Sequence, residues 1–317
     1  MTRKKIIGGL VIAAAFLSLL AALLVRAGNP ADGRGEGAGG RGSRGVVAVI
    51  DINGVIVGDE SATGIFGGES VGARTVMDQI RQVSKNPDIK AVVLRINSPG
   101  GTPAASQEIT EELNRLKAGG IKIVTSMGDV AASGAYWIAS ASDKIMANPG
   151  TITGSIGVIM QSHNLRGLYE KLGVGSETIK SGAYKDMGSS ERPMSEEERR
   201  IFQSMVDDTY LQFVETVSKG RNVSPEAVRE LNGRVLTGRQ AMKAGLVDQM
   251  GNFYDAVSLA GEISGIGKNP RTLNLSPQNQ WWRFLGDVGA SAGAAYTPAG
   301  GLRDFSGVLL LSPPLKM

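Results

Sequence analysis

Ser133 stands between small residues in ASGA, directly ahead of a run that can begin a helix. Its hydroxyl can act as a nucleophile if a base removes its proton, although a serine there can also be only a small residue where two backbones pass closely. The chain has no cysteine, and so offers no thiol nucleophile, disulfide or zinc–thiolate site. His163 is the only histidine, and its place after a predicted strand favours a surface or structural role. Serine chemistry would therefore need another base.

A lysine can be that base when it is buried, because desolvation disfavours the charged form and leaves the amine neutral. Lys185 stands in SGAYKD, where the neighbours Ser181–Tyr184 are small or amphipathic and would allow burial. The adjacent Asp186 would favour the ammonium if its carboxylate turned inward, so we expect it to point away. The residues alone also allow Lys185 to be an ordinary solvated lysine, as most lysines are.

Acyl transfer also needs backbone N–H groups that point at the developing negative charge. Two turns offer them. Gly100 and Gly101 follow an apolar strand in NSPGG, and Gly134 stands beside the Ser133 hydroxyl near a helix N-terminus. Glycine adopts backbone angles that other residues avoid, which exposes N–H groups. A glycine-rich turn between a strand and a helix is also found as a plain turn or a phosphate-binding loop.

Alternating strands and helices must hold these turns in place. The expected strands are VVAVIDINGVI (46–56), IKAVVLRI (89–96), IKIVTS (121–126) and KIMA (144–147); the expected helices are ARTVMDQIRQVSK (73–85), one that ends at Gly119 and one that follows Ser133. This alternation predicts an α/β fold of βαβ units with a mostly parallel sheet and flanking helices.

The second half of the chain is more helical. Ser195 with Glu198 forms a capping-box pattern ahead of a long helix. One face of that helix carries Phe202, Val206, Tyr210, Phe213 and Val217. Ser224, which precedes a proline, and Thr237 mark two further helix starts. From about Asn269 the pattern fails, so we assign residues 269–317 to a C-terminal tail.

The N-terminus is expected to anchor the chain in a membrane. Ile6–Val25 is an uninterrupted uncharged run of about the twenty residues that a bilayer-spanning helix requires. A cleaved signal peptide is the alternative, but its apolar region would be long and VRAGN lacks a good small-x-small cleavage site. Residues 1–5 and 26–45 both carry basic side chains, so charge alone does not set the orientation. The glycine-rich residues 26–45 predict a flexible linker.

The overall charge points to no nucleic-acid partner. The chain has 34 Lys and Arg against 30 Asp and Glu, and the net charge of +4 is spread without interleaved aromatic residues. An apolar content of 42% in 317 residues is ample for a large folded core.

Three separated motifs carry a family resemblance. RINSPGG, then GDVAASGAYWIASASDKIMANPGTITGSIGV, then KSGAYKDMGS resemble the signal peptide peptidase A family of membrane-bound serine peptidases (family S49). The resemblance runs from about Val46 to Ser264 and is to the short, single-repeat form. It implies a fold of the ClpP/crotonase group, with a peptidase domain at residues 46–268.

The resemblance implies a role for each matching residue. Ser133 is then the nucleophile and Lys185 the general base, while Ser155 in TGSIGV holds the lysine in place. Gly101 and Gly134 match the oxyanion donors. The residues alone also allow Ser155 to be a buried-strand serine that satisfies a neighbouring backbone group. The implied mechanism needs no metal and no cofactor.

The resemblance also implies partners and a location. The substrates would be remnant signal peptides and other apolar, membrane-derived peptides. The short form would assemble a ring-shaped homo-oligomer, in which the lysine of one protomer serves the serine of its neighbour. We expect a single-pass membrane protein with its catalytic domain on the extracytoplasmic side.

Two other functions remain open for the same fold. An acyl-CoA hydratase or isomerase also uses paired N–H groups, but it predicts catalytic carboxylates and an adenine-nucleotide pocket. A membrane-tethered, peptide-binding scaffold predicts peptide affinity without turnover. Likeness of fold alone does not distinguish among them.

Overall fold

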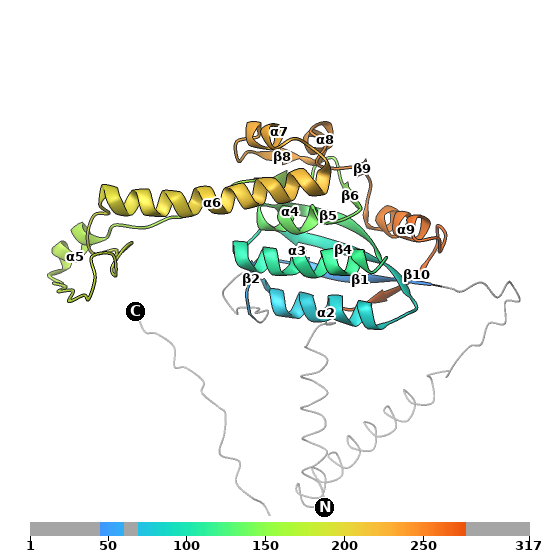
Figure 1. Cartoon of the computed structure of the whole chain (residues 1–317), viewed down its shortest axis with the longest axis horizontal. Helices are drawn as coiled ribbons and strands as arrows, with labels where there is room; N and C mark the ends of the chain where they lie inside the picture. The colour runs from blue at the N-terminus through green and yellow to red at the C-terminus, as the bar shows by residue number, and fades with distance from the viewer. Residues whose placement is uncertain (1–44, 60–68, 277–317) are drawn as a thin grey trace, which may run out of the picture. The chain divides into compact units, whose positions relative to one another are not determined.

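The computed structural model describes residues 45–59 and 69–276, which form an eight-stranded sheet flanked by helices (Figure 1). Its main path has the order β10-β1-β4-β5-β6-β9, and β7 and β8 extend it beside β5; β2 and β3 form a separate pair. The strands are β1 Val46–Asn53, β2 Val55–Val57, β3 Ser70–Gly72, β4 Ile89–Ser98, β5 Lys122–Ala132, β6 Lys144–Ala147, β7 Ile152–Gly154, β8 Val235–Thr237, β9 Gln249–Met250 and β10 Arg271–Asn274. All pairings are parallel except that of β7 with β8, so the predicted mostly parallel α/β sheet is confirmed.

The helices are α2 Ala73–Lys85, α3 Pro103–Ala118, α4 Gly134–Ala139, α5 Arg166–Leu172, α6 Glu196–Arg221, α7 Pro225–Glu230, α8 Gly238–Lys243 and α9 Phe253–Ile263. The predicted helices correspond to α2, α3, α4, α6, α7 and α8, whereas α5 and α9 were not predicted. The predicted capping box of Ser195 and Glu198 is present at the start of α6, and Ser224 and Thr237 cap α7 and α8. These local signals work because each cap satisfies helix N–H groups that have no partner within the helix.

Both faces of the sheet are covered. In β1, Ala48, Ile50 and Ile52 belong to the core that packs under α2, α3 and α4, whereas Val47 and Val49 belong to a second core beneath α9. A strand that is buried on both faces can be a continuous run of apolar residues. The sequences of β1, β4 and β5 are runs of this kind. The two cores fix the carboxyl ends of β4 and β5. The glycine pair Gly100 and Gly101 comes after β4, and Ser133 comes directly after β5.

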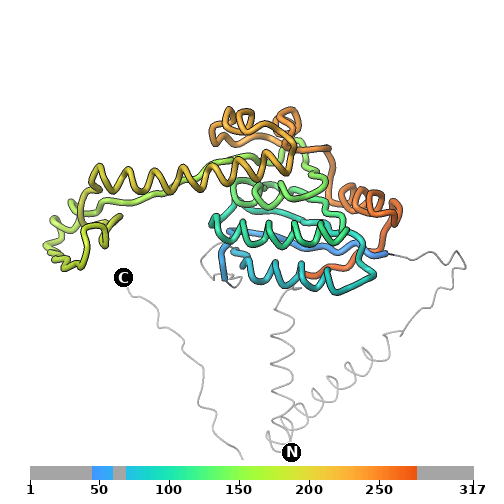
Figure 2. The backbone as a smooth tube through the Cα atoms, viewed as in Figure 1, coloured from blue at the N-terminus to red at the C-terminus, as the bar shows by residue number. Residues whose placement is uncertain are grey.

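Residues 157–195 and the N-terminal half of α6, here called the arm, project away from the sheet (Figures 1 and 2). α5 buries no residue. The predicted apolar face of α6 is buried at its C-terminal end but only half-buried along the arm. Large apolar side chains stay exposed on the arm, including Ile159 (91%), Leu172 (65%) and Ile179 (95%). The described residues therefore leave an apolar arm surface uncovered.

The sheet reaches into the segment that the sequence assigns to the tail. β10 pairs with β1 in parallel, although its sequence RTLN is short and its residues are all exposed. An exposed edge strand of this kind has no apolar alternation by which a sequence could reveal it. The predicted anchor at residues 6–25, nearly all of the linker and the tail beyond Ser276 lie outside the described residues. Among the residues that are described, no helix is long and apolar enough to cross a bilayer.

Candidate active site

Ser133 occupies a sharp turn between β5 and α4. Its backbone has φ 54° and ψ −125°, angles that are costly for any residue other than glycine. The Ser133 N–H donates to Gly154 O at 2.9 Å, and Ser133 O accepts from Trp137 N–H at 3.0 Å. All six residues of α4 are buried. Buried neighbours on both sides thus hold the serine in a strained conformation, which is a recurring feature of functional sites.

The turn that carries Gly100 and Gly101 lies directly against Ser133 and Gly134. A Cβ added to Gly100 would lie 2.8 Å from both Gly134 N and Ser133 Cβ, and one added to Gly134 would lie 3.1 Å from Gly101 N. Ile56 fixes this turn, since its N–H donates to Gly100 O at 2.9 Å and its carbonyl accepts from Thr102 N–H at 3.0 Å. The two predicted oxyanion donors, Gly101 and Gly134, are therefore neighbours in space.

Those two N–H groups are also available. Within residues 45–59 and 69–276, neither the Gly101 N–H nor the Gly134 N–H donates to a backbone carbonyl. Gly134 is the first residue of α4, where an N–H has no intrahelical acceptor. Paired free N–H groups beside a hydroxyl can stabilise an oxyanion that forms when the hydroxyl attacks a carbonyl.

Ser155 lies beside Ser133 through strand pairing. β5 and β7 are in register at Ala132 and Gly154, so the residue that follows each strand lies at the same edge of the sheet. Ser155 also has a positive φ, 52°, and its N–H donates to Arg234 O at 2.9 Å. Its half-buried hydroxyl makes no hydrogen bond with the part of the chain that the structure describes. The hydroxyl is thus free to receive a partner.

A small apolar cavity of about 110 Å³ opens next to Ser133. Its lining residues are Gly101, Pro103, Ser133, Gly134, Trp137, Gly157, Val158, Ile159 and Phe213. The rings of Trp137 and Phe213 stack with centroids 4.5 Å apart and form a rigid wall. The cavity suits one apolar side chain of modest size and offers no charged group.

Lys185 does not reach this site within one chain. It lies on the arm, its side chain is exposed, and the cavity beside Ser133 does not include it. Its backbone N–H donates to Gly182 O at 3.2 Å, but its amine makes no hydrogen bond or ion pair with any described residue. The structure therefore brings together Ser133, Gly101, Gly134 and Ser155, and leaves Lys185 apart.

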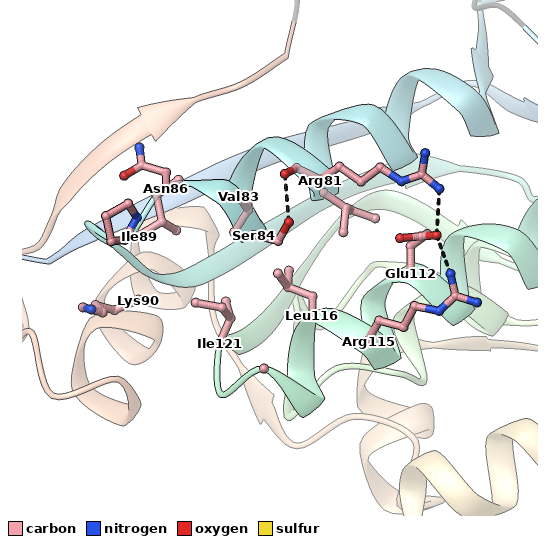
Figure 3. Close-up of a pocket in the computed structure, with 13 residues that line it drawn as sticks. Arg81, Val83, Ser84, Asn86, Ile89, Lys90, Glu112, Arg115, Leu116 and Ile121 are labelled. Atoms are coloured by element: carbon pink, nitrogen blue, oxygen red, sulfur yellow. Dashed lines mark hydrogen bonds and ion pairs between the residues drawn. The ribbon is translucent and has the colours of Figure 1, made fainter.

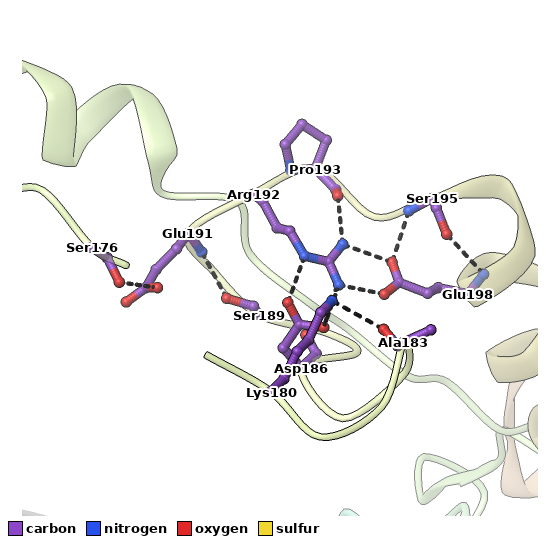
Figure 4. A network of polar contacts seen from close by, with 10 residues as sticks. All are labelled: Ser176, Lys180, Ala183, Asp186, Ser189, Glu191, Arg192, Pro193, Ser195 and Glu198. Atoms are coloured by element: carbon purple, nitrogen blue, oxygen red, sulfur yellow. Dashed lines mark hydrogen bonds and ion pairs between the residues drawn. The ribbon is translucent and has the colours of Figure 1, made fainter. Parts of the chain in front are cut away.

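The carboxylate of Asp186 is turned toward other cations (Figure 4). Arg192 Nε and Nη2 donate to its two oxygens at 2.9 Å each, and Lys180 Nζ lies 2.6 Å from one of them. The Arg192 guanidinium, assisted by Lys180, holds the pKa of the Asp186 carboxyl well below its usual range. The expectation that Asp186 faces away from Lys185 agrees with these contacts.

Two other hollows have no link to Ser133. One of about 320 Å³ lies between the C-terminal ends of α2 and α3, where Arg81 and Arg115 share the Glu112 carboxylate (Figure 3). The other, of about 920 Å³, follows the arm and includes exposed His163. His163 therefore lies apart from the nucleophile. Among the described residues, no group of three or more His, Asp or Glu could hold a metal ion.

Sequence reasoning did not identify the walls of the cavity. Trp137 and Phe213 are 3% and 1% exposed, and their apolar character is equally that of core residues. Ser106 was also missed, although an added Cβ on Gly134 would lie 2.5 Å from its Oγ. Only the packing of α4 against α3 and α6 shows that these residues border the site.

Known proteins are similar to this chain in sequence. Residues 115–266 match the model of peptidase family S49. A Synechocystis sp. protein named as a protease is 44% identical over 203 residues, which cover 64% of this chain and 73% of that one. The signal peptide peptidase SppA of Enterococcus faecium is 43% identical over 212 residues, which cover 67% and 61% of the two chains.

A longer relative matches over only part of its length. Protease 4 of Salmonella typhi is 38% identical over 221 residues, which cover 69% of this chain and 35% of Protease 4. The chain thus spans about a third of that relative. On these similarities, the chain belongs to peptidase family S49, a family of serine-type peptidases, and is of the signal peptide peptidase A type.

Proposed function

We propose that this protein is a serine endopeptidase in which Ser133 is the nucleophile and Lys185 of a neighbouring copy is the general base. The observation that carries the proposal is the strained Ser133 turn, which lies beside two free glycine N–H groups and an apolar cavity. A hydroxyl, an oxyanion site and a side-chain pocket within one small region are what peptide hydrolysis requires.

In this mechanism, neutral Lys185 takes the proton from Ser133 as Oγ bonds to the scissile carbonyl carbon. The Gly101 and Gly134 N–H groups stabilise the oxyanion, and the Lys185 ammonium then protonates the leaving amine as the C–N bond breaks. Water, deprotonated by the same amine, then attacks the acyl carbon, and the Lys185 ammonium returns the proton to Ser133 Oγ as the C–O bond of the acyl-enzyme breaks. Ser155, at the same edge of the sheet, would accept or donate a hydrogen bond that orients the lysine.

A second copy would supply the lysine. A general base must come within hydrogen-bond reach of the proton that it removes, and Lys185 of the same chain is exposed on the arm. The uncovered apolar side chains of the arm suit burial against another protomer. Docking of the arm beside a neighbour's Ser133 would remove water from Lys185, and desolvation favours the neutral amine.

The proposed substrates are remnant signal peptides and other apolar peptides derived from membranes. The cavity beside Ser133 has no charged lining residue, so it favours an apolar side chain next to the scissile bond. An extended peptide would bind by strand-like backbone pairing, which is tolerant of sequence. The predicted anchor, Ile6–Val25, would keep the enzyme at the membrane where such peptides collect, with the catalytic domain on the extracytoplasmic side.

A serine-reactive probe tests the proposed chemistry directly. We expect a fluorophosphonate to label the purified wild-type protein at Ser133, as identified by peptide mass spectrometry, and to leave Ser133→Ala unlabelled. A hydratase or a peptide-binding scaffold on the same fold has no activated serine and would remain unlabelled. Absence of wild-type labelling while casein or a signal peptide is being cleaved would exclude Ser133 as the nucleophile.

Gly134→Ala should damage the oxyanion site. The added methyl would lie 2.5 Å from Ser106 Oγ and 3.1 Å from Gly101 N, so the two N–H groups must move apart. We expect kcat to fall by about 10²- to 10³-fold, the usual effect of losing an oxyanion donor. Gly150→Ala is the matched control, because nothing lies within 4 Å of its added Cβ. Unchanged kcat in Gly134→Ala would show that this N–H pair does not serve the reaction.

A further inference from the structure

Arg192 joins the loop that carries Lys185 to the first turn of α6. Its guanidinium contacts two carboxylates at once, those of Asp186 and Glu198 (Figure 4). The Arg192 Nη1 lies 2.9 Å from Glu198 Oε2, and Nη2 contacts the other oxygen of the same carboxylate. A planar guanidinium suits such double bridging, whereas a lysine ammonium has no comparable fork.

The helix end of this bridge is rigid. The Glu198 side chain is 4% exposed, and its Oε2 accepts from Ser195 N–H at 2.8 Å in the capping box of α6. The Arg192 guanidinium, with the Ser195 N–H, lowers the pKa of Glu198 to about 2. The carboxylate therefore stays ionised over the whole neutral and mildly acidic range, and Arg192 keeps a fixed partner.

The loop end of the bridge flanks Lys185 on both sides. Asp186 follows Lys185 and is held by Arg192, while Tyr184 precedes it and its hydroxyl donates to Glu197 on α6. Within the loop, Ser189 N–H donates to Asp186 O at 3.1 Å. Lys185 thus has an exposed amine on a backbone whose neighbouring residues are both attached to α6.

The bridge also controls the charge beside the amine. Asp186 is the acidic residue adjacent to Lys185, and its carboxylate is occupied by Arg192 and Lys180. Other charged or titratable groups around this loop are Tyr184 and Glu191 on the loop, and Glu197, Glu198 and Arg200 on α6. If Arg192 were removed, the Asp186 carboxylate would keep only Lys180 and could turn to the Lys185 ammonium. A carboxylate next to an ammonium stabilises its charged form, which is the wrong form for a base.

We propose that Arg192 is a positioning residue for catalysis, which fixes the Lys185 loop on α6 and keeps Asp186 from pairing with the Lys185 ammonium. This inference rests on the proposed role of Lys185 as the base. Arg192 acts through Lys185 and Asp186, since it lies on the arm and does not line the cavity beside Ser133.

Arg192→Met tests both parts of the inference in the full-length protein. We expect kcat to fall roughly tenfold to a hundredfold, because a displaced base loses near-attack geometry. KM should change little, since the peptide-binding cavity is untouched. The acid limb of the pH profile of kcat/KM should move to higher pH, because the freed Asp186 carboxylate holds the proton on the amine. A purely structural role would lower activity without moving that limb.

A second substitution separates the two effects. In Arg192→Met with Asp186→Asn, the carboxylate of the residue adjacent to Lys185 is removed, so the acid limb should return toward its wild-type position while kcat stays low. Arg166→Met is the matched control on the same arm, where the guanidinium pairs with exposed Glu170 at 2.8 Å. An exposed pair of this kind contributes little, so the control should keep wild-type kinetics.

The outcomes distinguish this inference from the proposed function. If Lys185→Ala is inactive but Arg192→Met has wild-type kcat or an unmoved acid limb, the role of Arg192 is wrong and the dyad stands. If Lys185→Ala retains wild-type activity, the dyad itself is wrong. Circular dichroism and gel filtration of each variant, matched to wild type, ensure that lost activity is not lost folding.

Discussion

Alanine at either Ser133 or Lys185 should abolish peptide hydrolysis, with kcat lower by about 10⁴- to 10⁶-fold than in the wild type. Without the Ser133 hydroxyl no acyl-enzyme can form, and without the Lys185 amine no group removes the hydroxyl proton. Members of such a pair act as a unit, so the double variant should be no worse than either single variant. Digestion of casein or of a synthetic signal peptide measures the effect.

These losses should occur without a loss of stability. The Lys185 side chain is exposed and makes no hydrogen bond or ion pair with the described residues, so its truncation removes no stabilising contact among them. Lys171→Ala, an exposed lysine on the same arm, is the matched control and should keep full activity. Residual activity within tenfold of wild type in either dyad variant would mean that another base or nucleophile performs the reaction.

Two inactive variants should restore activity when they are assembled together. Ser133→Ala still carries Lys185, and Lys185→Ala still carries Ser133, so a mixed oligomer contains interfaces where an intact serine meets an intact lysine. In a random 1:1 assembly with a head-to-tail interface, about a quarter of the sites regain both groups. Coexpression, or denaturation and joint refolding, should therefore recover about a quarter of wild-type turnover from two preparations that have almost none.

Joint assembly of the two variants distinguishes a site shared between protomers from a site within one chain. If Lys185 served the serine of its own chain, every protomer in the mixture would lack one of the two groups and the mixture would stay inactive. Dilution of the wild type should also abolish activity as the oligomer dissociates, and analytical ultracentrifugation measures that dissociation. A fully active monomer at sedimentation equilibrium would contradict the shared dyad.

Much of the fold followed from short-range signals. The helix at 73–85 was predicted at its observed limits, because its buried residues recur at helical spacing. Gly119 ends α3 as expected, since its N–H closes the last turn on the preceding carbonyls. β10 was missed because an exposed edge strand of four residues is defined by its partner β1 and not by its own side chains.

The candidate site also has one part that the local sequence indicates and another part that only the folded chain shows. The turns at Gly101 and Ser133 are local features whose residue types allow an oxyanion site and a nucleophile, and it is the family resemblance of the surrounding motifs that implies those roles. The walls formed by Trp137 and Phe213 come from helices that meet only in the folded chain. Arg192 read as one basic residue among many, since its bridging of Asp186 and Glu198 depends on how the loop folds back on α6.

Residue types and their order were thus sufficient for the alternation of the central strands and helices and for the caps, because hydrophobic period and capping act over a few neighbouring residues. Distances between remote segments required the folded chain. Packing placed Ser133, Gly134 and Gly101 together and set Ser155 beside them, and it extended the arm so that Lys185 lies away from the serine of its own chain. The physical reason is that α6 packs apolar residues into the core only at its C-terminal end, with Phe213, Val214 and Val217, so its N-terminal half and the loop attached to it project from the sheet.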